Sequence, residues 1–517
     1  MIDLQNKAES LASRTPGHSV DKRRRSCAGA HWALLVLAWF GVMGEAMADS
    51  ISSETWYQVW LKGERIGYVR SVRNETDREI RHQETFSVSL KRATDPVRIW
   101  TEETHIESPQ GKPLGFELNQ RLGDSVAQAR GQWQQDHWQV EQSDGLQWRQ
   151  VATTIPADAL LTEGSERLIR AARDAGEKEV RYAMFDPSSL SVVQVALTLG
   201  DLETVQSPTG PIKAYRVDQM MRMAGASLAS TEWQDATGEM RYSRMPMLGT
   251  ELELVLSTQA EATPEAIGGD LFHLTSLPAP RVLSVRERSA PMRYWLKVDG
   301  QVELPEQAGE QRARRVDAKH CELPDGASTR CFRIDIDAPN FRDQTIAAPE
   351  LKTPSSWVQS DDPKIVAFAT KKAQSAKTDS ERMQLLTHAV SARLADKNLA
   401  SAYASASEAF ADRSGDCTEH ALLLAAAGRA LGIPTRIAAG LAYTNEFAGS
   451  SRVFVPHAWT QAFIDGRWQS FDAALGQYDS GHLLLAVGNG DPGMYFGSLN
   501  ALGSLAIARI GKGRATP

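Results

Sequence analysis

Cysteine, long apolar runs and clusters of basic residues are all scarce in this chain of 517 residues. Beyond the first 50 positions there is no block rich in Lys and Arg, which argues against a nucleic acid as partner. We find no internal repeat, phosphate-binding glycine loop, collagen pattern or heptad pattern, which argues against repeat proteins, phosphate-loop enzymes and fibrous proteins. No second Cys/His pair stands near Cys417 and His420, which argues against a zinc site.

The first 48 residues have the pattern of a secretory signal peptide. Four basic residues at 22–25 precede an apolar stretch at 28–42, and the small residues Ala46 and Ala48 mark a cleavage site after Ala48. The apolar stretch is shorter than the roughly 20 residues that a membrane-spanning helix needs, so an uncleaved anchor is the less favoured alternative. We therefore expect a periplasmic or secreted protein, without a membrane span after cleavage and more acidic than the formal charge of −7.

Three cysteines remain after the leader. Cys321 and Cys331 flank a Pro-Asp-Gly turn signal, which predicts that they face each other across a hairpin. In an oxidising compartment we expect them to form a disulfide. Cys417 is then an odd thiol, and in an exported protein catalysis is one reason to keep such a thiol.

The surroundings of Cys417 predict the start of a buried helix. Asp416 is a favourable N-cap, and Glu419 stands three residues later, as in a capping box. Residues 421–431 are almost all Ala and Leu, and Gly432 and Pro434 follow as stop signals. The helix N-terminus favours a thiolate at Cys417, whereas the two nearby carboxylates oppose it, so a neighbouring base would help.

A hairpin downstream offers such a base. Asp465 and Gly466 form the strongest short hairpin signal. If they are the two loop residues, Trp459 faces Asp472, and His457 lies on the same face and diagonal to Asp472. This geometry lets Asp472 orient His457 by a hydrogen bond, which would complete a Cys-His-Asp constellation with Cys417.

The motifs at residues 415–421, 431–440, 457–459 and 465–472 together resemble the core of the transglutaminase-like superfamily of cysteine enzymes. The resemblance extends over residues 355–487 and implies a papain-like α+β fold. It also implies Cys417 as the nucleophile, His457 as the base and Asp472 as the residue that orients the base. Two positions depart from the usual pattern: Gln461 stands where an acidic residue is common, and Ala473 where proline is common.

These patterns together predict an α+β protein with an N-terminal antiparallel β-rich part. We expect a signal peptide at 1–48 and a β-rich domain of unknown role at 49–278, in which a sheet curves around a helix near 166–175. We expect two further parts: a small β unit with the cysteine pair at 279–345 and a transglutaminase-like domain at 346–517.

The resemblance implies an exported cysteine enzyme that acts on amide bonds of peptides or proteins through a thioester, without cofactor or metal. Hydrolysis is favoured over cross-linking because it needs no second substrate site. One alternative is a non-catalytic periplasmic binding or scaffold protein, and another is a thiol redox sensor at Cys417. His420, one helical turn after Cys417, is a rival partner that we interpret as a packing residue or as a residue that supports the site residues without taking part itself. The sequence does not indicate an oligomeric state.

Overall fold

The computed structural model describes residues 51–513, apart from short gaps at 93–94, 124, 135–136, 144, 146, 152–154, 189, 224–225, 248–249, 264–267, 271–274, 301, 338–342, 397–402, 492–497 and 499–500. The predicted signal peptide, at 1–48, lies outside the described residues. Among the residues that are described, no helix has the length and apolar character to span a membrane.

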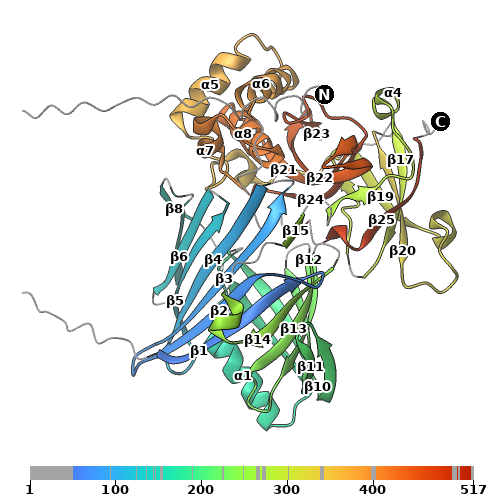
Figure 1. Ribbon diagram of the computed structural model, residues 1–517. Helices are drawn as coiled ribbons and strands as arrows, with labels where there is room; N and C mark the ends of the chain where they lie inside the picture. Colours follow the sequence, from blue (N-terminus) through green and yellow to red (C-terminus); the bar gives the residue numbers. More distant parts are fainter. Residues whose placement is uncertain are drawn as a thin grey trace, which may run out of the picture. The chain divides into compact units, whose positions relative to one another are not determined.

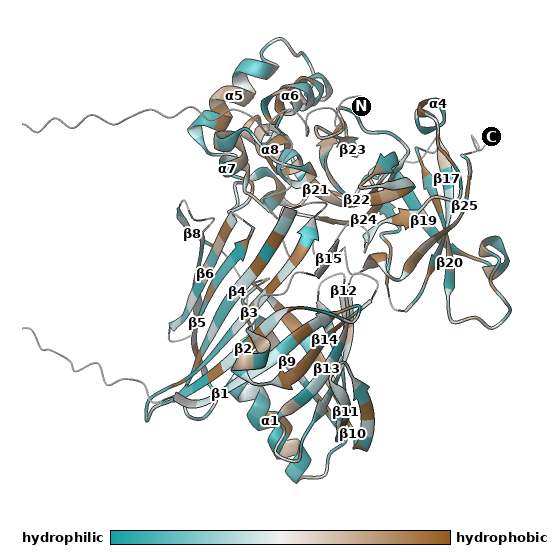
Figure 2. Cartoon of the chain, in the orientation of Figure 1, coloured by the Kyte–Doolittle hydropathy of each residue, from teal (hydrophilic) through white to brown (hydrophobic). Residues whose placement is uncertain are grey.

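Two antiparallel meanders, joined where β1 pairs with β14, form the first and largest sheet (Figure 1). In spatial order its strands are β8 (Trp148–Gln150), β7 (His137–Ser143), β6 (Ser125–Gln134), β5 (Pro113–Leu122), β4 (Asp95–Glu107), β3 (Ile80–Arg92), β2 (Glu64–Glu75), β1 (Ile51–Leu61), β14 (Thr250–Ser257), β13 (Met240–Met247), β12 (Ala226–Gln234), β11 (Gly210–Met223), β10 (Ser191–Ser207) and β9 (Glu179–Asp186). The short strand β15 (Gly268–Asp270) pairs with β3 in parallel. Hydrophilic and hydrophobic bands alternate along the long strands, as expected for antiparallel strands (Figure 2).

The helix predicted in this part is α1 (Thr162–Asp174), and it contacts β3, β4 and β9. β3 and β4 are neighbours, but β9 is the strand at the opposite end of the sheet, so the sheet must curve around the helix. The carboxylate of Glu107 on β4 accepts hydrogen bonds from the backbone N–H groups of Glu163 and Gly164, at 2.6 and 2.9 Å. A carboxylate at this position satisfies amides that have no partner within the helix.

A second sheet and four helices form the part that carries the predicted site. Its strands, in order, are β16 (Leu277–Pro278), β22 (Ser450–Ile464), β21 (Thr435–Phe447) and β24 (His482–Gly488), with β23 (Arg467–Phe471) paired to β22. The helices are α5 (Pro363–Ala373), α6 (Asp379–Arg393), α7 (Ala406–Asp412) and α8 (Cys417–Ala430). Helices α5, α6 and α7 all contact α8, which places α8 in the middle of the group.

The third sheet combines residues that are distant in sequence. Its strands, in order, are β18 (Gln307–Ala308), β19 (Gln311–Val316), β20 (Arg330–Ile336), β17 (Met292–Val298) and β25 (Leu505–Lys512). The last strand, β25, therefore pairs with β17 of the small β unit. Four short helices complete the described elements: α2 (Gln259–Ala262), α4 (Val285–Arg288), η1 (Ala318–Cys321) and η2 (Pro349–Lys352).

The structure contains the predicted disulfide, but not the hairpin that was expected to carry it. Cys321 and Cys331 are joined with a Cα–Cα distance of 5.7 Å. Cys321 ends the 3-10 helix η1, whereas Cys331 lies on β20, so the bond ties a helical turn to a strand. Asp317 starts that turn by accepting a hydrogen bond from the N–H of Lys319, a local contact that competes with strand extension.

The fold class is confirmed only in part. The chain is mostly sheet with few helices. A papain-like α+β architecture for residues 346–517 is not confirmed.

Reduction of the disulfide should destabilise the protein by about 3 kcal/mol, because the bond closes a loop with a sequence separation of 10 residues. Urea unfolding with and without reductant measures this loss. The double substitution Cys321→Ala and Cys331→Ala is the control, since reductant should not change its stability. An equal effect of reductant on both proteins would contradict the assignment.

Candidate active site

Cys417 begins helix α8, as predicted. Asp416 is the N-cap, and its Oδ1 accepts a hydrogen bond from the backbone N–H of Thr418 at 2.8 Å. Glu419 completes the capping box, because its Oε2 accepts from the N–H of Asp416 at 2.8 Å. Cys417 is partly buried against the apolar core and lies outside the disulfide. The sequence therefore fixes the thiol in the first turn of a firmly capped helix.

Two hydrogen bonds set the register between α8 and the sheet. The hydroxyl of Thr460 on β22 donates to the carbonyl of Ala421 at 2.8 Å. The hydroxyl of Thr435 on β21 donates to the carbonyl of Ala425 at 3.0 Å, and Thr435 pairs with Ala462 of β22. Moving along the helix from Ala421 to Ala425 thus corresponds to moving forward along β22, so the helix and this strand run in the same direction.

This register brings the start of α8 close to His457 along the strand. Cys417 precedes Ala421 by one helical turn, which is about 6 Å along the helix axis. The same distance is about two residues of a strand and leads from Thr460 back to Ala458, the neighbour of His457. By this estimate, the start of α8 lies level, along the strand direction, with the part of β22 that carries His457.

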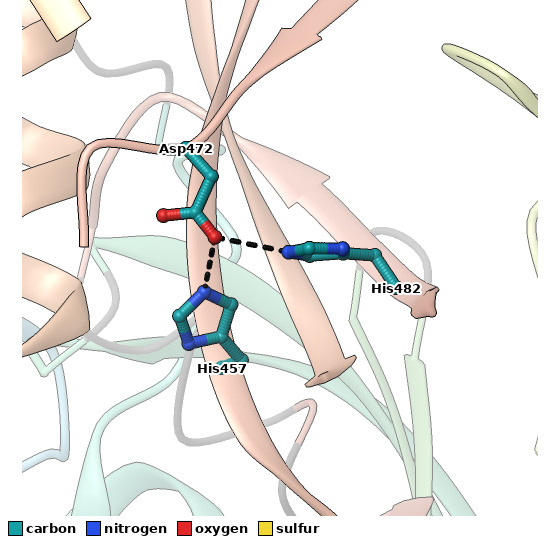
Figure 3. Close-up of side chains that lie close together, drawn as sticks. All are labelled: His457, Asp472 and His482. Carbon is teal, nitrogen blue, oxygen red and sulfur yellow. Dashed lines mark hydrogen bonds and ion pairs between the residues drawn. The ribbon is translucent and has the colours of Figure 1, made fainter. Parts of the chain in front are cut away.

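His457 and Asp472 are in direct contact, as predicted from the hairpin. Ile464 pairs with Arg467 around the two-residue turn, which is the predicted register. The Nε2 atom of His457 donates to Oδ2 of Asp472 at 2.8 Å, and both side chains are buried (Figure 3). The other ring nitrogen of His457, Nδ1, points away from Asp472 (Figure 3).

Asp472 accepts four hydrogen bonds in a buried position. Its Oδ1 accepts from the backbone N–H groups of Ala474 and Leu475, at 2.8 and 2.9 Å. Its Oδ2 accepts from Nε2 of His457 and from Nε2 of His482, at 2.8 and 2.9 Å. Burial alone would raise the pKa of Asp472, but the two histidines outweigh burial and lower it below its ordinary value. Asp472 is therefore an anion over the whole working range of pH.

His482 is the residue of this group that the sequence did not predict. It lies on β24, which pairs with β21 on the side opposite β22, and its ring is 5.5 Å from that of His457, centroid to centroid. Burial lowers the pKa of His482, but hydrogen bonds to Asp472 and Asp479 raise it to about 9. No local motif marks His482, because its place depends on how β24 pairs with a strand some 40 residues earlier.

Asp416 and Glu419, the two acids beside Cys417, carry less negative charge than two fully ionised carboxylates would. Burial and the charge of Asp416 raise the pKa of Glu419 well above its ordinary value. Glu419 also accepts a hydrogen bond from the backbone N–H of Ala404 at 2.7 Å, so it is held in place by several partners. The raised pKa of Glu419 reduces its negative charge at neutral pH and so weakens the opposition to a thiolate that the sequence indicated.

Two further residues are held by hydrogen bonds: Gln461, which departs from the usual motif, and His420, the rival partner of Cys417. Gln461 accepts a hydrogen bond from Nε of Arg436 at 2.8 Å and donates to the hydroxyl of Ser470 at 3.1 Å. His420 is buried, and its Nδ1 donates to the carbonyl of Asp416 at 2.6 Å. These contacts agree with the interpretation of His420 as a packing residue within the helix.

Two groups of side chains have the spacing of metal ligands among the described residues. In the first, His457, Asp472 and His482 offer atoms within 4.8 Å of one another, but one oxygen of Asp472 already hydrogen-bonds both Nε2 atoms. Each Nε2 must then carry a proton and has no lone pair for a metal.

The second group consists of His82, Glu163 and Glu166 near α1. There Arg73 and Arg167 already form ion pairs with Glu163, at 3.2 and 2.7 Å. Neither group therefore favours a metal.

Comparison with protein families gives one match. Residues 366–473 match the model of the transglutaminase-like superfamily, and the matched range contains Cys417, His457 and Asp472. The C-terminal part of the chain thus carries a transglutaminase-like domain. No curated protein matches the chain.

Three solved structures show a remote likeness. A candidate cysteine protease from Cytophaga hutchinsonii is 17% identical, covers 43% of this chain and 85% of its own, and has a TM-score of 0.27. A β-barrel-like protein of domain of unknown function DUF1849 from Brucella abortus is 15% identical, covers 40% and 95%, and has a TM-score of 0.31. A candidate protease from Parabacteroides distasonis is 10% identical, covers 78% and 71%, and has a TM-score of 0.20. TM-scores this low do not establish a shared fold.

Glu419→Gln should flatten the pH dependence of stability. Because the pKa of Glu419 is raised in the folded state, the native protein binds more protons than the unfolded one above the ordinary pKa. The free energy of unfolding of the wild type should therefore fall as pH rises from about 5 to about 8, more steeply than that of the variant. Urea unfolding at several pH values measures both slopes. The exposed Glu177→Gln should keep the wild-type slope, and parallel slopes for wild type and Glu419→Gln would refute the shift.

Proposed function

We propose that the transglutaminase-like domain is a cysteine enzyme acting on amide bonds of peptides or proteins, with Cys417 as nucleophile, His457 as base and Asp472 as orienting residue. The observation that carries the proposal is the hydrogen bond of 2.8 Å between Nε2 of His457 and Asp472. It fixes the ring so that Nδ1, which points away from Asp472, is the nitrogen that exchanges a proton with the thiol (Figure 3).

In the first step His457 takes the thiol proton, and the thiolate of Cys417 attacks the amide carbonyl carbon. A carbon–sulfur bond forms and the carbonyl oxygen becomes an oxyanion, for which the backbone N–H of Cys417 at the helix N-terminus is the proposed first donor. The imidazolium of His457 then gives its proton to the amide nitrogen. The carbon–nitrogen bond breaks, the amine leaves, and the acyl group remains on sulfur as a thioester.

In the second step an acceptor resolves the thioester. If the acceptor is water, neutral His457 takes its proton and the oxygen attacks the carbonyl carbon. The carbon–sulfur bond then breaks, a carboxylic acid leaves, and the imidazolium returns its proton to the thiolate of Cys417. If the acceptor is an amine, the same steps yield a new amide and therefore a cross-link. Hydrolysis is the favoured outcome because it requires no second substrate site.

The proposal places the enzyme outside the cytoplasm, as a periplasmic or secreted protein. The disulfide between Cys321 and Cys331 supports this location, because disulfides persist in oxidising compartments. Peptides or proteins are the proposed substrates.

The pH dependence of Cys417 alkylation by iodoacetamide tests the triad without a known substrate. We expect a thiol pKa well below the unperturbed value of about 8.5. His457→Ala should raise it, since the thiolate loses its imidazolium partner. Asp472→Asn should act in the same direction, because the ring of His457 loses its orienting acceptor.

Cys417→Ala is the blank for alkylation, and His388→Gln, an exposed residue on α6, is the matched histidine control. A thiol pKa that is ordinary in the wild type and unchanged in His457→Ala would contradict a catalytic triad. That result would favour the binding or scaffold function instead.

A further inference from the structure

The ring of His482 lies between two acceptors. Its Nε2 donates to Oδ2 of Asp472 at 2.9 Å, and its Nδ1 lies 2.9 Å from the carbonyl oxygen of Asp479. The carboxylate of Asp479 is also close, with Oδ1 at 3.4 Å from Nδ1. The backbone N–H of Asp479 is also directed at Nδ1, at the longer distance of 3.4 Å. Because the nearest partner of each nitrogen is an oxygen acceptor at 2.9 Å, the contacts favour a proton on both nitrogens, which is the imidazolium form.

The charged groups around His482 agree with this protonation state. Asp472 follows β23 and Asp479 lies in the loop before β24, while His457 faces the ring from β22. Tyr478 packs on the ring at 4.8 Å and is buried so deeply that its pKa lies well above its ordinary value, so it adds no charge. Arg288 of α4 forms an ion pair with Asp479, which offsets part of the negative charge of that carboxylate.

The loop that holds His482 is tied to the third sheet. The hydroxyl of Ser480 is within hydrogen-bonding distance of the carbonyls of Arg288 and Ala290, at 2.8 and 2.7 Å. The hydroxyl of Tyr294 on β17 donates to the carbonyl of Ser480 at 2.7 Å. Residues outside the matched family range thus hold one side of the Asp472 carboxylate in place.

We propose that His482 is a positioning residue, which holds the Asp472 carboxylate in place for His457 as a second donor on the same oxygen. The consequence for catalysis rests on the proposed function of the triad, whereas the charge state of His482 does not. A histidine kept only for packing would fill the same place without donating to Asp472.

Two substitutions separate the hydrogen bond from the charge. His482→Gln keeps an N–H donor toward Asp472 but removes the positive charge. His482→Leu removes both. His388→Gln is again the control, since His388 is exposed on α6.

The first measurement is an NMR titration of the ¹⁵N-labelled histidines in the full-length protein carrying Cys417→Ala. The His482 signals are assigned by their loss in His482→Gln. We expect His482 to remain protonated to about two pH units above an ordinary histidine. An ordinary titration of His482 near 6.5 would overturn the inference.

The second measurement is the rate of Cys417 alkylation by iodoacetamide in proteins that keep the thiol. Substitutions of residues that orient a reactive group typically cost tenfold or more, so His482→Leu should slow alkylation at pH 7 by about tenfold. His482→Gln should stay within about threefold of the wild type, because Asp472 keeps its donor. Equal losses in both variants would point to a purely structural role and would overturn the positioning role.

The two measurements separate failure of this inference from failure of the proposed function. If Cys417 is unreactive in the wild type while His482 titrates as expected, the enzyme hypothesis fails and the charge assignment of His482 stands. If Cys417 is reactive but His482 titrates as an ordinary histidine, the triad stands and the inference fails.

Discussion

The carboxylate of Asp472 is buried and accepts hydrogen bonds from two backbone N–H groups and two histidines. A buried carboxylate without such partners would be costly, so the elements that supply them must hold their relative positions. The hairpin of β22 and β23 brings His457, the turn after β23 brings the amides, and β24 brings His482. The geometry of the candidate site thus depends on this one ion being solvated by protein instead of water.

Sequence reasoning succeeded where the determining contacts are local. The Asp465–Gly466 turn sets the register of a two-stranded hairpin, and from that register the contact between His457 and Asp472 follows by counting residues. The helix start at Cys417 is equally local, because Asp416 and Glu419 satisfy the first amides of α8 within a few residues. These two signals placed the predicted triad residues on the elements where the structure has them. The catalytic roles of these residues remain a proposal.

Sequence reasoning failed where strands pair across long distances. His482 joins Asp472 only because β24 pairs with β21, and no turn or spacing between them determines that pairing. The pairing of β25 with β17 is a similar case, in which some 200 residues separate the partners. Cys321 also escaped prediction in detail, since its capped 3-10 turn competes with the hairpin that the Pro-Asp-Gly signal suggested. Such pairings are settled by burial in the finished core, which a local pattern does not contain.

Two buried side chains of the candidate site, Glu419 and His482, keep a proton and so limit its negative charge. At the start of α8, burial and Asp416 keep a proton on Glu419, which limits the negative charge beside Cys417. Around Asp472 the surrounding acids keep a proton on His482, which limits the uncompensated negative charge beside His457. The first effect favours a thiolate directly, because it removes an anion from its neighbourhood. The second acts on the carboxylate, which is held between two rings and so keeps its place beside His457. Because the proton on Glu419 is lost as pH rises, its support for the thiolate is greatest at neutral and mildly acidic pH, where an isolated cysteine is almost entirely protonated.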